Sequence, residues 1–508
     1  MSIASAWSIA LVGMEGTLVE VEAAISAGLP RTVLVGLPDA ALHEARDRCR
    51  AALTAAGVGW PNELLTINLT PASLPKGGSH YDLAIAAAVL AASGVVPRQL
   101  AGGMVLMGEL GLDGRVRPVR GILPGLLAAQ RCGRTVAVVP WEQVGEARLV
   151  EGMDVRGVAC LDDLVEVLHG RQVLREPAPV ASIDVPADVE TADMSDLLGQ
   201  PEARWAAEVA AAGGHHMLLQ GPPGVGKTML ARRLPGLLPE LTTPEALEVS
   251  ALHSLAGRDV NGGLIRRPPF ADPHHNATVA AMVGGGSRMA RPGAISMAHR
   301  GVLFLDEIPE YAPQVVEALR TPIESGFVSI ARSQGVVRYP AQFQLVLAAN
   351  PCPCGMAGTP GARCRCPSQA IRRYNARLSG PILDRIDIHQ HLTSVTRVLA
   401  KADTTVESTA VVAARVADAR QRSQRRLAGT GWRRNAEVPG HVARARLPDS
   451  GLMLVEKQVL RGQMSARGVD KVARLAWTLA DLAARNEILI DDVAAAMALH
   501  EGDWMATV

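Results

Sequence analysis

The hydrophobic positions of the first 170 residues alternate between short apolar runs and longer alanine-rich stretches. Runs rich in Val, Leu and Ile predict strands, and stretches with apolar residues three or four positions apart predict helices. An α/β or α+β domain is therefore expected over residues 1–170. The predicted strands are Leu18–Val21, Thr32–Val35, Leu64–Leu69, Val105–Met107 and Thr135–Val139, and the predicted helices are Leu42–Ala56, Leu83–Ser93 and Ile122–Arg131.

This periodicity stops once, in a segment rich in proline and acidic residues. Between Arg171 and Asp193 the sequence RQVLREPAPVASIDVPADVETAD has neither a helical nor a strand period. Proline fixes φ and lacks an amide hydrogen, so it does not continue a helix or a central strand. We predict an interdomain linker over residues 171–195.

Beyond the linker, apolar strands again alternate with helices. A helix at Glu202–Ala212 precedes strands at His216–Gln220, Gly301–Leu305 and Gln344–Ala349. Strands that alternate with helices favour a largely parallel sheet, here over residues 196–392. From 393 to 508 only helices are predicted, at Ser408–Leu427, Gly451–Leu460, Ser465–Ala484 and Ile490–His500.

Composition limits the classes of partner. The chain has 508 residues and a formal charge of +1, so no global field attracts it to nucleic acid or to an anionic membrane. The N-terminus lacks the positively charged start of a signal peptide, and the longest apolar stretch, Leu83–Val96, is too short to span a bilayer. We expect a cytoplasmic protein with no membrane partner, and any polyanion must bind locally.

The strongest chemical signal is a P-loop pattern, G-x-x-x-x-G-K-[ST], directly after an apolar strand and before a helical stretch. Its glycines let backbone amides close around phosphates, Lys227 reaches the β- and γ-phosphates, and the Thr228 hydroxyl is a ligand for Mg²⁺. The alternative is a glycine-rich turn without a ligand. The predicted ATP-binding residues are Gly221, Pro222, Pro223, Gly224, Val225, Gly226, Lys227 and Thr228.

Two further strands end in polar residues. Val302–Leu305 is followed by Asp306, predicted to hold Mg²⁺, and Glu307, predicted to polarise the attacking water. Gln344–Ala349 is followed by Asn350, predicted to orient that water. The alternatives are an ordinary strand that leads into an acidic helix start, and an asparagine that forms a turn before proline.

Together these residues resemble the AAA+ ATPases, specifically the magnesium-chelatase-like branch and its bacterial YifB/ComM group. The resemblance implies an AAA+ P-loop NTPase core over 196–392 with a helix-2 insertion at 262–298, a C-terminal helical lid over 393–508, and a hexameric ring with nucleotide at each interface. The matching motifs are LTPASLPKGGSHYDL at 69–83, RPPF at 267–270, PHH at 273–275, PGAISMAHRGVLFLDEIPE at 292–310, NPCPCG at 350–355, SGPILDRIDIH at 379–389 and SARGVDKVARLAWTLADL at 465–482.

The resemblance also implies roles for arginines. Arg385 would be the arginine finger that reaches the γ-phosphate of the neighbouring subunit, with Arg377 as the second candidate. Arg467 would be the second sensor in the lid. A cation supplied across an interface makes hydrolysis depend on assembly. The alternatives are a surface ion pair for Arg385 and a solvated helix position for Arg467.

Two features of the sequence indicate that the protein binds DNA. Phe327–Tyr339 predicts a β-hairpin that turns at Ser333–Gly335 and carries Arg332 and Arg338. Residues 372–434 contain thirteen basic residues against five acidic ones. Few aromatic residues are available for base stacking, so we predict sequence-independent binding of single-stranded or branched DNA through its backbone. The alternative is a solvated surface.

Four cysteines are close in sequence, as Cys352-Pro-Cys354 and Cys364-Arg-Cys366. Four thiolates on two tight turns can close a tetrahedral structural Zn²⁺ site, so we predict zinc as an additional cofactor beside ATP and Mg²⁺. Two disulfides and unliganded cysteines remain as alternatives.

The first domain resembles the proteolytic domain of Lon, which has a ribosomal-S5-like α/β fold, through PKGGSH at 75–80. The resemblance is degenerate, because His80 stands where Lon has its serine, Ser79 lies one place early, and Leu123 stands where a lysine is expected. A serine nucleophile needs an activating base. We therefore predict a binding or assembly module without proteolytic activity.

Three functions follow from these motifs. The first, favoured by the basic segment and the hairpin, is an ATP-driven ring motor on DNA, a helicase or branch-migration factor in recombination or natural transformation. The second is a chelatase-type motor subunit that remodels a partner protein. The third is an ATP-dependent protease that uses Ser79.

Overall fold

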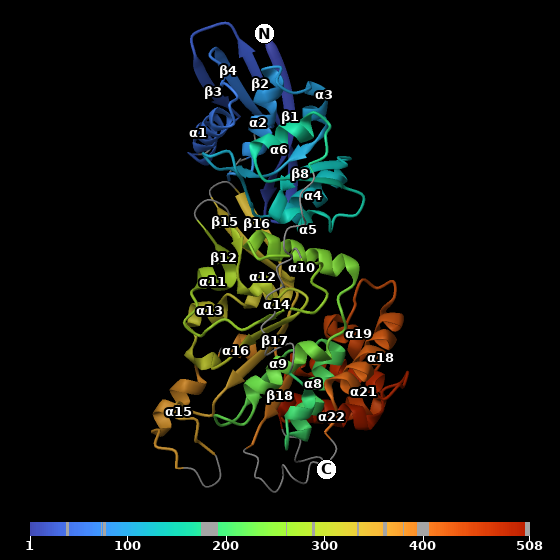
Figure 1. Ribbon diagram of the computed structural model, residues 1–508. Coiled ribbons are helices and arrows are strands. Elements are labelled where there is room, and N and C mark those ends of the chain that lie inside the picture. The colour runs from blue at the N-terminus through green and yellow to red at the C-terminus, as the bar shows by residue number, and fades with distance from the viewer. Residues whose placement is uncertain are drawn as a thin grey trace.

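Two β-sheets, one on each side of the predicted linker, organise the molecule (Figure 1). Most of the predicted linker, the hairpin turn at 333–334 and residues 394–405 of the predicted lid lie outside the described residues. Residues 1–173 are referred to below as the N-terminal unit, 192–393 as the central unit and 406–502 as the C-terminal helices. The computed structural model describes residues 1–36, 40–72, 74, 78–173, 192–260, 262–286, 290–332, 335–358, 363–378, 380–393 and 406–502.

The N-terminal unit is built on a mixed seven-stranded sheet in the order β3-β4-β2-β1-β5-β8-β9. Its centre is an antiparallel hairpin of β1 (Ser2–Val12) and β2 (Glu15–Ser26). The hydrophobic pattern does not predict β1, because Ala and Ser occupy many of its positions and weaken the strand signal. The other strands are β3 (Arg31–Val35), β4 (Leu64–Thr70), β5 (Val105–Leu106), β8 (Val136–Pro140) and β9 (Asp154–Val158), with a separate ladder of β6 (Glu109–Leu110) and β7 (Val116–Arg117).

The helix α2 (Asp82–Ala92) is buried at every residue. Its sequence, DLAIAAAVLAA, is apolar on all sides, which suits a helix enclosed by other elements. The Arg48 guanidinium approaches the Asp82 carboxylate at 2.8 Å and ties the neighbouring helix to its first turn. The other helices of this unit are α1 (Ala40–Ala55), α3 (Arg98–Gly103), α4 (Ile122–Arg131), η1 (Trp141–Gln143), α5 (Val144–Ala147) and α6 (Leu161–Leu168).

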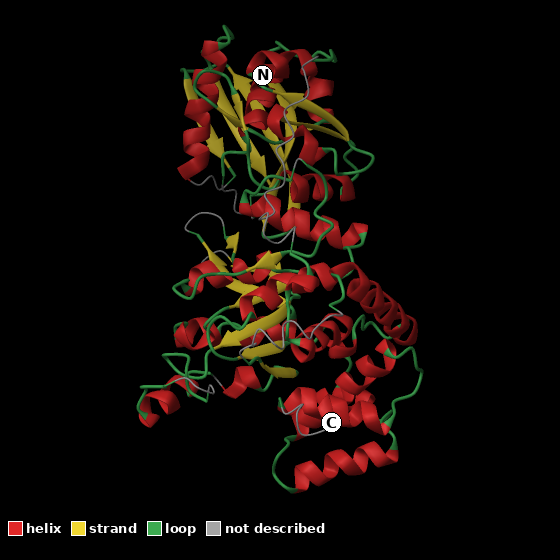
Figure 2. Ribbon diagram, turned by 60° about the horizontal axis from the view of Figure 1, so that its bottom comes forward, coloured by secondary structure: helices red, strands yellow, loops and turns green. Residues whose placement is uncertain are grey.

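The central unit contains a five-stranded parallel sheet in the order β11-β14-β17-β10-β18 (Figure 2). The predicted parallel α/β sheet is confirmed. Because β17 lies between β10 and β14, the carboxyl ends of these three strands meet at one edge, where α/β proteins bind ligands. The strands are β10 (Met217–Gln220), β11 (Phe270–Ala271), β14 (Val302–Leu305), β17 (Gln344–Ala349) and β18 (Ile388–His391).

Helices cover this sheet, and short elements occupy the segment predicted as an insertion. The helices are η2 (Met194–Asp196), α8 (Pro201–Gly213), α9 (Lys227–Leu237), α10 (Thr243–Ala256), α11 (Val279–Val283), α12 (Ala294–Met297), η3 (Ile308–Glu310), α13 (Pro313–Glu317), α14 (Arg320–Ser325), α15 (Ser368–Asn375) and α16 (Gly380–Leu383). The segment 262–298 also contains the two-stranded ladder of β12 (Gly284–Gly285) and β13 (Arg291–Pro292).

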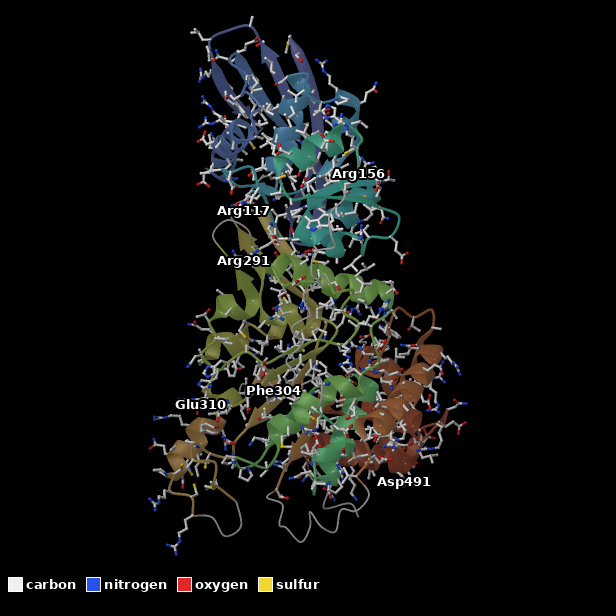
Figure 3. The ribbon with its side chains drawn as sticks, in the orientation of Figure 1. Arg117, Arg156, Arg291, Phe304, Glu310 and Asp491 are labelled. Atoms are coloured by element: carbon white, nitrogen blue, oxygen red, sulfur yellow. The ribbon has the colours of Figure 1, made fainter. Side chains whose placement is uncertain are left out.

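The predicted hairpin forms from β15 (Phe327–Arg332) and β16 (Gly335–Pro340), and it packs against the N-terminal unit. A Cβ atom added at Gly13, in the turn between β1 and β2, would lie 2.9 Å from Val337 Cγ1. Tyr339 is fully buried in a cluster that includes Leu11. Arg291 lies at the same junction in Figure 3. The strand β16 of the hairpin is therefore part of the contact between the N-terminal unit and the central unit.

Over its described residues, the C-terminal part consists of helices joined by turns and loops, with no strand. These helices share one hydrophobic core with α8, α9 and the central sheet. Within the described residues, no helix is both long enough and apolar enough to cross a bilayer. The elements are α18 (Thr409–Leu427), η4 (Asn435–Glu437), α19 (Gly440–Arg444), α20 (Asp449–Leu460), α21 (Ala466–Leu482) and α22 (Ile490–Glu501).

Many arginines of the basic segment have partners inside the chain, contrary to the expectation of a free basic surface. Arg415 pairs with Glu208 at 2.7 Å and with Glu407 at 2.6 Å. Arg426 pairs with the buried Asp481. These pairs join the C-terminal helices to each other and to the central unit. The excess positive charge of this segment is therefore weaker support for DNA binding than the sequence suggests.

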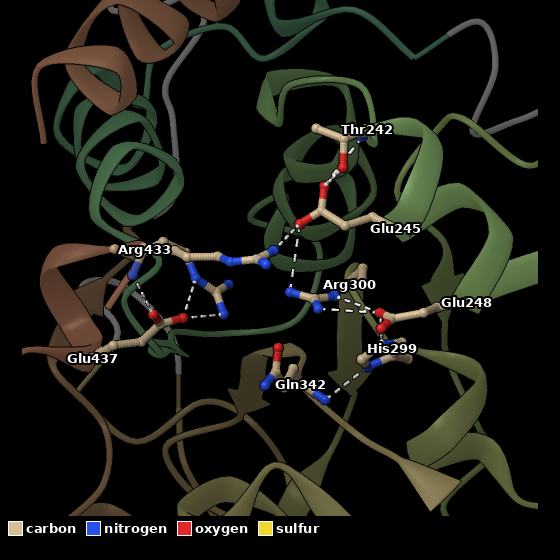
Figure 4. A network of polar contacts seen from close by, with 9 residues as sticks. Thr242, Glu245, Glu248, His299, Arg300, Gln342, Arg433 and Glu437 are labelled. Carbon is tan, nitrogen blue, oxygen red and sulfur yellow. Dashed lines mark hydrogen bonds and ion pairs between the residues drawn. The ribbon is translucent and has the colours of Figure 1, made fainter. Parts of the chain in front are cut away.

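A polar network joins α10 to the residues before β14 (Figure 4). The Glu248 carboxylate accepts from His299 Nε2 at 3.3 Å and from Arg300 Nη2 at 3.1 Å. His299 Nδ1 accepts the Gln342 amide hydrogen at 3.0 Å, so the ring proton is on Nε2 and faces the carboxylate. The hydrogen bond from His299, with the nearby Arg300 charge, lowers the pKa of Glu248 to about 2.

This low pKa predicts an acid-sensitive contribution to stability. The Glu248 carboxylate stabilises the fold fully above its ordinary pKa of 4.5, and the contribution is lost as the pH falls towards about 2. Because the side chain is 48% exposed, we expect only about 1 kcal/mol. Urea unfolding of Glu248→Gln should show a flatter acid slope than wild type or the control Glu151→Gln, which changes an exposed glutamate. Equal acid slopes for all three proteins would contradict this assignment.

Candidate nucleotide site

The glycine-rich loop 221–226 joins the carboxyl end of β10 to the first turn of α9. Gly226, the residue before the helix, has φ 97°, and Gly224 has φ 78°. Both values lie in the left-handed region, which favours glycine. The backbone amides and the positive end of the α9 dipole at this terminus attract anions. The predicted strand, loop and helix are therefore in the arrangement that a phosphate site requires.

Lys227 is 8% exposed and connects the loop to the neighbouring strand. Its Nζ atom donates to the carbonyl oxygens of Gly221 at 2.7 Å and Pro222 at 2.9 Å, and to Asn350 Oδ1 at 2.9 Å. Burial lowers the pKa of this lysine, and the charges of Asp306 and Glu307 oppose that shift. All three acceptors are neutral, so a phosphate that reaches the loop would offer Lys227 a stronger, charged partner.

Thr228 and Asp306 come from different elements and meet directly. The Thr228 hydroxyl donates to Asp306 Oδ2 at 2.7 Å, and Asp306 Oδ1 accepts the Glu307 amide hydrogen at 2.9 Å. A hydroxyl and a carboxylate beside a phosphate-binding loop are the oxygen donors that Mg²⁺ prefers in nucleotide sites. The donor set therefore fits Mg²⁺.

Glu307 is held in an unusual backbone conformation, with φ 51° and ψ 45°. Its carboxylate lies 3.9 Å from His275 Nδ1. His275 belongs to the PHH motif at 273–275. The approach to Glu307 is decided by the fold, because β11 brings the motif beside β14. Left-handed backbone at a non-glycine residue often marks a functional site.

The arginines predicted to act on nucleotide do not lie beside the glycine-rich loop of the same chain. Arg385 is 13% exposed and pairs with Glu324, and Arg467 approaches Asp384 at 3.1 Å. Both arginines line one cavity of about 520 Å³, whose lining does not include Lys227. Within the described residues, Arg385 thus forms an ion pair, which was the alternative expected for it, whereas Arg467, for which a solvated helix position was the alternative, also approaches a carboxylate.

Arg377, the second candidate for the arginine finger, lies neither beside Lys227 nor beside Arg385, but next to Pro309 and Glu310. Its Nη1 atom lies 3.4 Å from the Glu310 carboxylate and 3.2 Å from the Pro309 carbonyl oxygen. Glu310 lies on the side of the central unit that faces α15 (Figure 3). Arg377 and Arg385 thus occupy different surroundings.

The C-terminal helices hold the backbone next to Arg385, a feature that the sequence did not reveal. Lys471 of α21 is 6% exposed and donates to the Ile386 carbonyl oxygen at 2.7 Å. His500 Nδ1 of α22 lies 2.9 Å from the Asp387 carbonyl oxygen. These two contacts connect α21 and α22 to the segment that carries Arg385.

The remaining candidate residues form two separate clusters. The sulfur atoms of the four cysteines at 352, 354, 364 and 366 all lie within 4.8 Å of one another. In the N-terminal unit, the Ser79 hydroxyl donates to the Glu109 carboxylate, and Leu123 is fully buried. Ser79 therefore has an acidic partner, which does not supply the lysine base of a Lon-type protease.

The sequence matches three family models along its length. Residues 193–399 match the model for magnesium chelatase subunit ChlI, residues 21–143 match a model for subunit ChlI of Mg-chelatase, and residues 406–500 match the model for the ChlI C-terminal region. The three matches fall on the central unit, the N-terminal unit and the C-terminal helices, respectively.

Relatives of nearly the same length are found in several bacteria. An uncharacterised protein of Mycobacterium tuberculosis is 52% identical over 99% of both chains. The uncharacterised protein YifB of Escherichia coli is 39% identical over 95% of this chain and 94% of its own. Competence protein ComM of Haemophilus influenzae is 37% identical over 98% of this chain and 97% of its own. The chain therefore belongs to the magnesium-chelatase-like family of AAA+ ATPases, together with YifB and ComM.

Proposed function

We propose that this chelatase-like AAA+ ATPase is a ring-forming motor that hydrolyses ATP to move on DNA. In this proposal the loop 221–226 and Lys227 bind the phosphates of ATP. Thr228 and Asp306 would hold Mg²⁺, which would supply positive charge against that of the phosphates. Glu307 accepts a proton from the attacking water, and the Asn350 amide orients that water. The meeting of Lys227, Thr228, Asp306 and Asn350 at one sheet edge supports these roles.

Assembly into a ring would complete the site. Arg385 and Arg467 share a cavity that does not include Lys227, so the geometry supports their action on a nucleotide held by another copy of the chain. A cation supplied by the neighbour makes hydrolysis depend on assembly and couples turnover between subunits. We take the ring to be hexameric, with residues 196–392 as the ATPase core and 393–508 as its lid.

The observation that carries the DNA proposal is the likeness to competence protein ComM over nearly the full length of both chains. Competence is the uptake of DNA, which points to recombination or transformation as the setting. The hairpin of β15 and β16 supports the proposal, because Arg338 is exposed on it. Contact through such arginines would read the DNA backbone and not the base sequence.

A second function is a chelatase-type motor that remodels a partner protein. It is favoured by the three family models, all of which are named for a magnesium chelatase subunit. In either case we propose that residues 1–170 are a degenerate Lon-like, ribosomal-S5-like module that contributes to assembly. The Glu109 partner of Ser79 does not support proteolysis.

Assays of ATP hydrolysis and unwinding with added DNA should distinguish a motor on DNA from a motor that remodels a partner protein. We expect forked or three-stranded DNA to stimulate ATP hydrolysis by the wild-type protein at moderate salt and to be unwound. Arg338→Glu, which reverses the charge at this one position of the hairpin, should lose about tenfold in apparent DNA affinity and keep its basal hydrolysis rate. The control Arg148→Glu makes the same charge change at an exposed position of the N-terminal unit and should behave as wild type. If DNA neither binds nor stimulates hydrolysis, the motor-on-DNA proposal is wrong.

A further inference from the structure

Four cysteine sulfurs converge in the loop after β17. The sulfur of Cys352 lies 3.4 Å from that of Cys354 and 3.7 Å from that of Cys364, and the sulfurs of Cys354 and Cys364 are 3.6 Å apart. Cys366 completes the set within 4.8 Å. Sulfurs placed tetrahedrally about 2.3 Å from Zn²⁺ are about 3.8 Å from one another. The observed spacing is close to that of a four-thiolate zinc site.

The spacing does not fit disulfide bonds. A disulfide would bring two sulfurs to about 2.0 Å and leave the other pairs longer, whereas these three separations are nearly equal. The Ala357 amide hydrogen points at Cys352 Sγ, with a nitrogen-to-sulfur distance of 3.3 Å, and such donors stabilise metal-bound thiolates. Arg363 and Arg365 flank Cys364 and are exposed, so their charges offset the negative charge of four thiolates.

The same loop touches the P-loop. Cys352 follows Asn350 by two residues, and the Asn350 amide oxygen accepts from Lys227. Gly355 turns the loop with φ 77°, and its amide donates to the Cys352 carbonyl oxygen at 2.8 Å. A Cβ atom at Gly355 would lie 2.5 Å from Pro223 Cδ, so the backbone of this turn packs directly on the P-loop.

We propose that Cys352, Cys354, Cys364 and Cys366 bind one structural Zn²⁺. We further propose that the metal-bound turn, packed against Pro223, stabilises the conformation of the P-loop that binds nucleotide, an effect called the bracing below. Binding releases the thiol protons and fills all four coordination positions, so no open position remains for water. Only the bracing rests on the proposed nucleotide site, because metal binding requires no nucleotide.

The metal content of the purified protein tests the proposed binding of Zn²⁺ by the four cysteines. The full chain, purified under reducing conditions in the presence of zinc, should contain one Zn²⁺ per chain by elemental analysis. Cys354→Ser and Cys366→Ser should lose it, and Cys132→Ser, which changes an exposed cysteine elsewhere, should keep it. Metal-stripped wild type titrated with Co²⁺ should develop the absorption bands of tetrahedral thiolate coordination, which covers the case in which a serine variant does not fold. Reduced wild type that binds neither metal would overturn the zinc site.

Two glycine variants of the same loop test the bracing. Gly355→Ala places a Cβ atom against Pro223 in a left-handed backbone conformation, so it should keep zinc and bind a fluorescent ATP analogue about tenfold more weakly. Gly358→Ala has φ 73° but open space around the new atom, and it is the matched control. Equal nucleotide affinity of the two variants would overturn the bracing. Wild type that binds no nucleotide would instead refute the ATPase proposal and leave the zinc result standing.

Discussion

Lys227→Ala is expected to reduce ATP hydrolysis by about 100-fold or more, because it removes a preorganised cation from the phosphate site. The structure gives a reason for the size of the effect. Lys227 is buried and lies within 2.9 Å of three acceptors from the P-loop and from Asn350, so its ammonium group is held in a fixed position beside the loop. Steady-state hydrolysis and equilibrium binding of an ATP analogue are the measurements.

A lysine elsewhere in the chain provides the control for this substitution. Lys457, on α20, is exposed, and Lys457→Ala should hydrolyse ATP at the wild-type rate. Thermal unfolding of both variants checks that the fold is retained. A folded Lys227→Ala protein with near wild-type hydrolysis would show that the loop 221–226 is not the catalytic nucleotide site.

Arg385→Ala should reduce hydrolysis by about 1,000-fold or more, the range expected for an arginine finger. The Arg385 guanidinium pairs with Glu324 in a cavity that does not include Lys227. We therefore expect its target to be a nucleotide on the neighbouring subunit. The loss should appear mainly in the hydrolysis rate, with little change in nucleotide affinity.

Mixing two inactive variants tests action across the interface. In a mixture of Arg385→Ala and Lys227→Ala, an Arg385→Ala subunit keeps its P-loop and receives an intact Arg385 from its Lys227→Ala neighbour. Hydrolysis should therefore recover partly, whereas neither variant is active alone. Arg373→Ala, at an exposed arginine of α15, should be active without mixing. A mixture that stays inactive although the subunits co-assemble would mean that Arg385 acts within its own subunit or does not act on nucleotide.

The differences between the expectations based on the sequence and the contacts in the structure have a common cause. Arg426 and Arg415 add to a basic segment when the chain is read as a sequence, but the fold places them beside Asp481, Glu208 and Glu407. Local charge counts do not include carboxylates that are distant in sequence. The same limit applies to His275, whose neighbour Glu307 follows the strand β14, and β14 pairs with the strand β11 that precedes His275.

The sequence by itself determined the parallel α/β sheet, the P-loop and the polar residues that end β14 and β17. These features depend on hydrophobic periodicity and on residues adjacent in the chain, which a linear pattern contains. Only the tertiary structure decided that Lys227 meets Asn350, that Gly355 packs on Pro223, and that Arg385 lies in a separate cavity with Arg467. These contacts join segments far apart in sequence, and the order of the strands and the packing of the C-terminal helices bring them together.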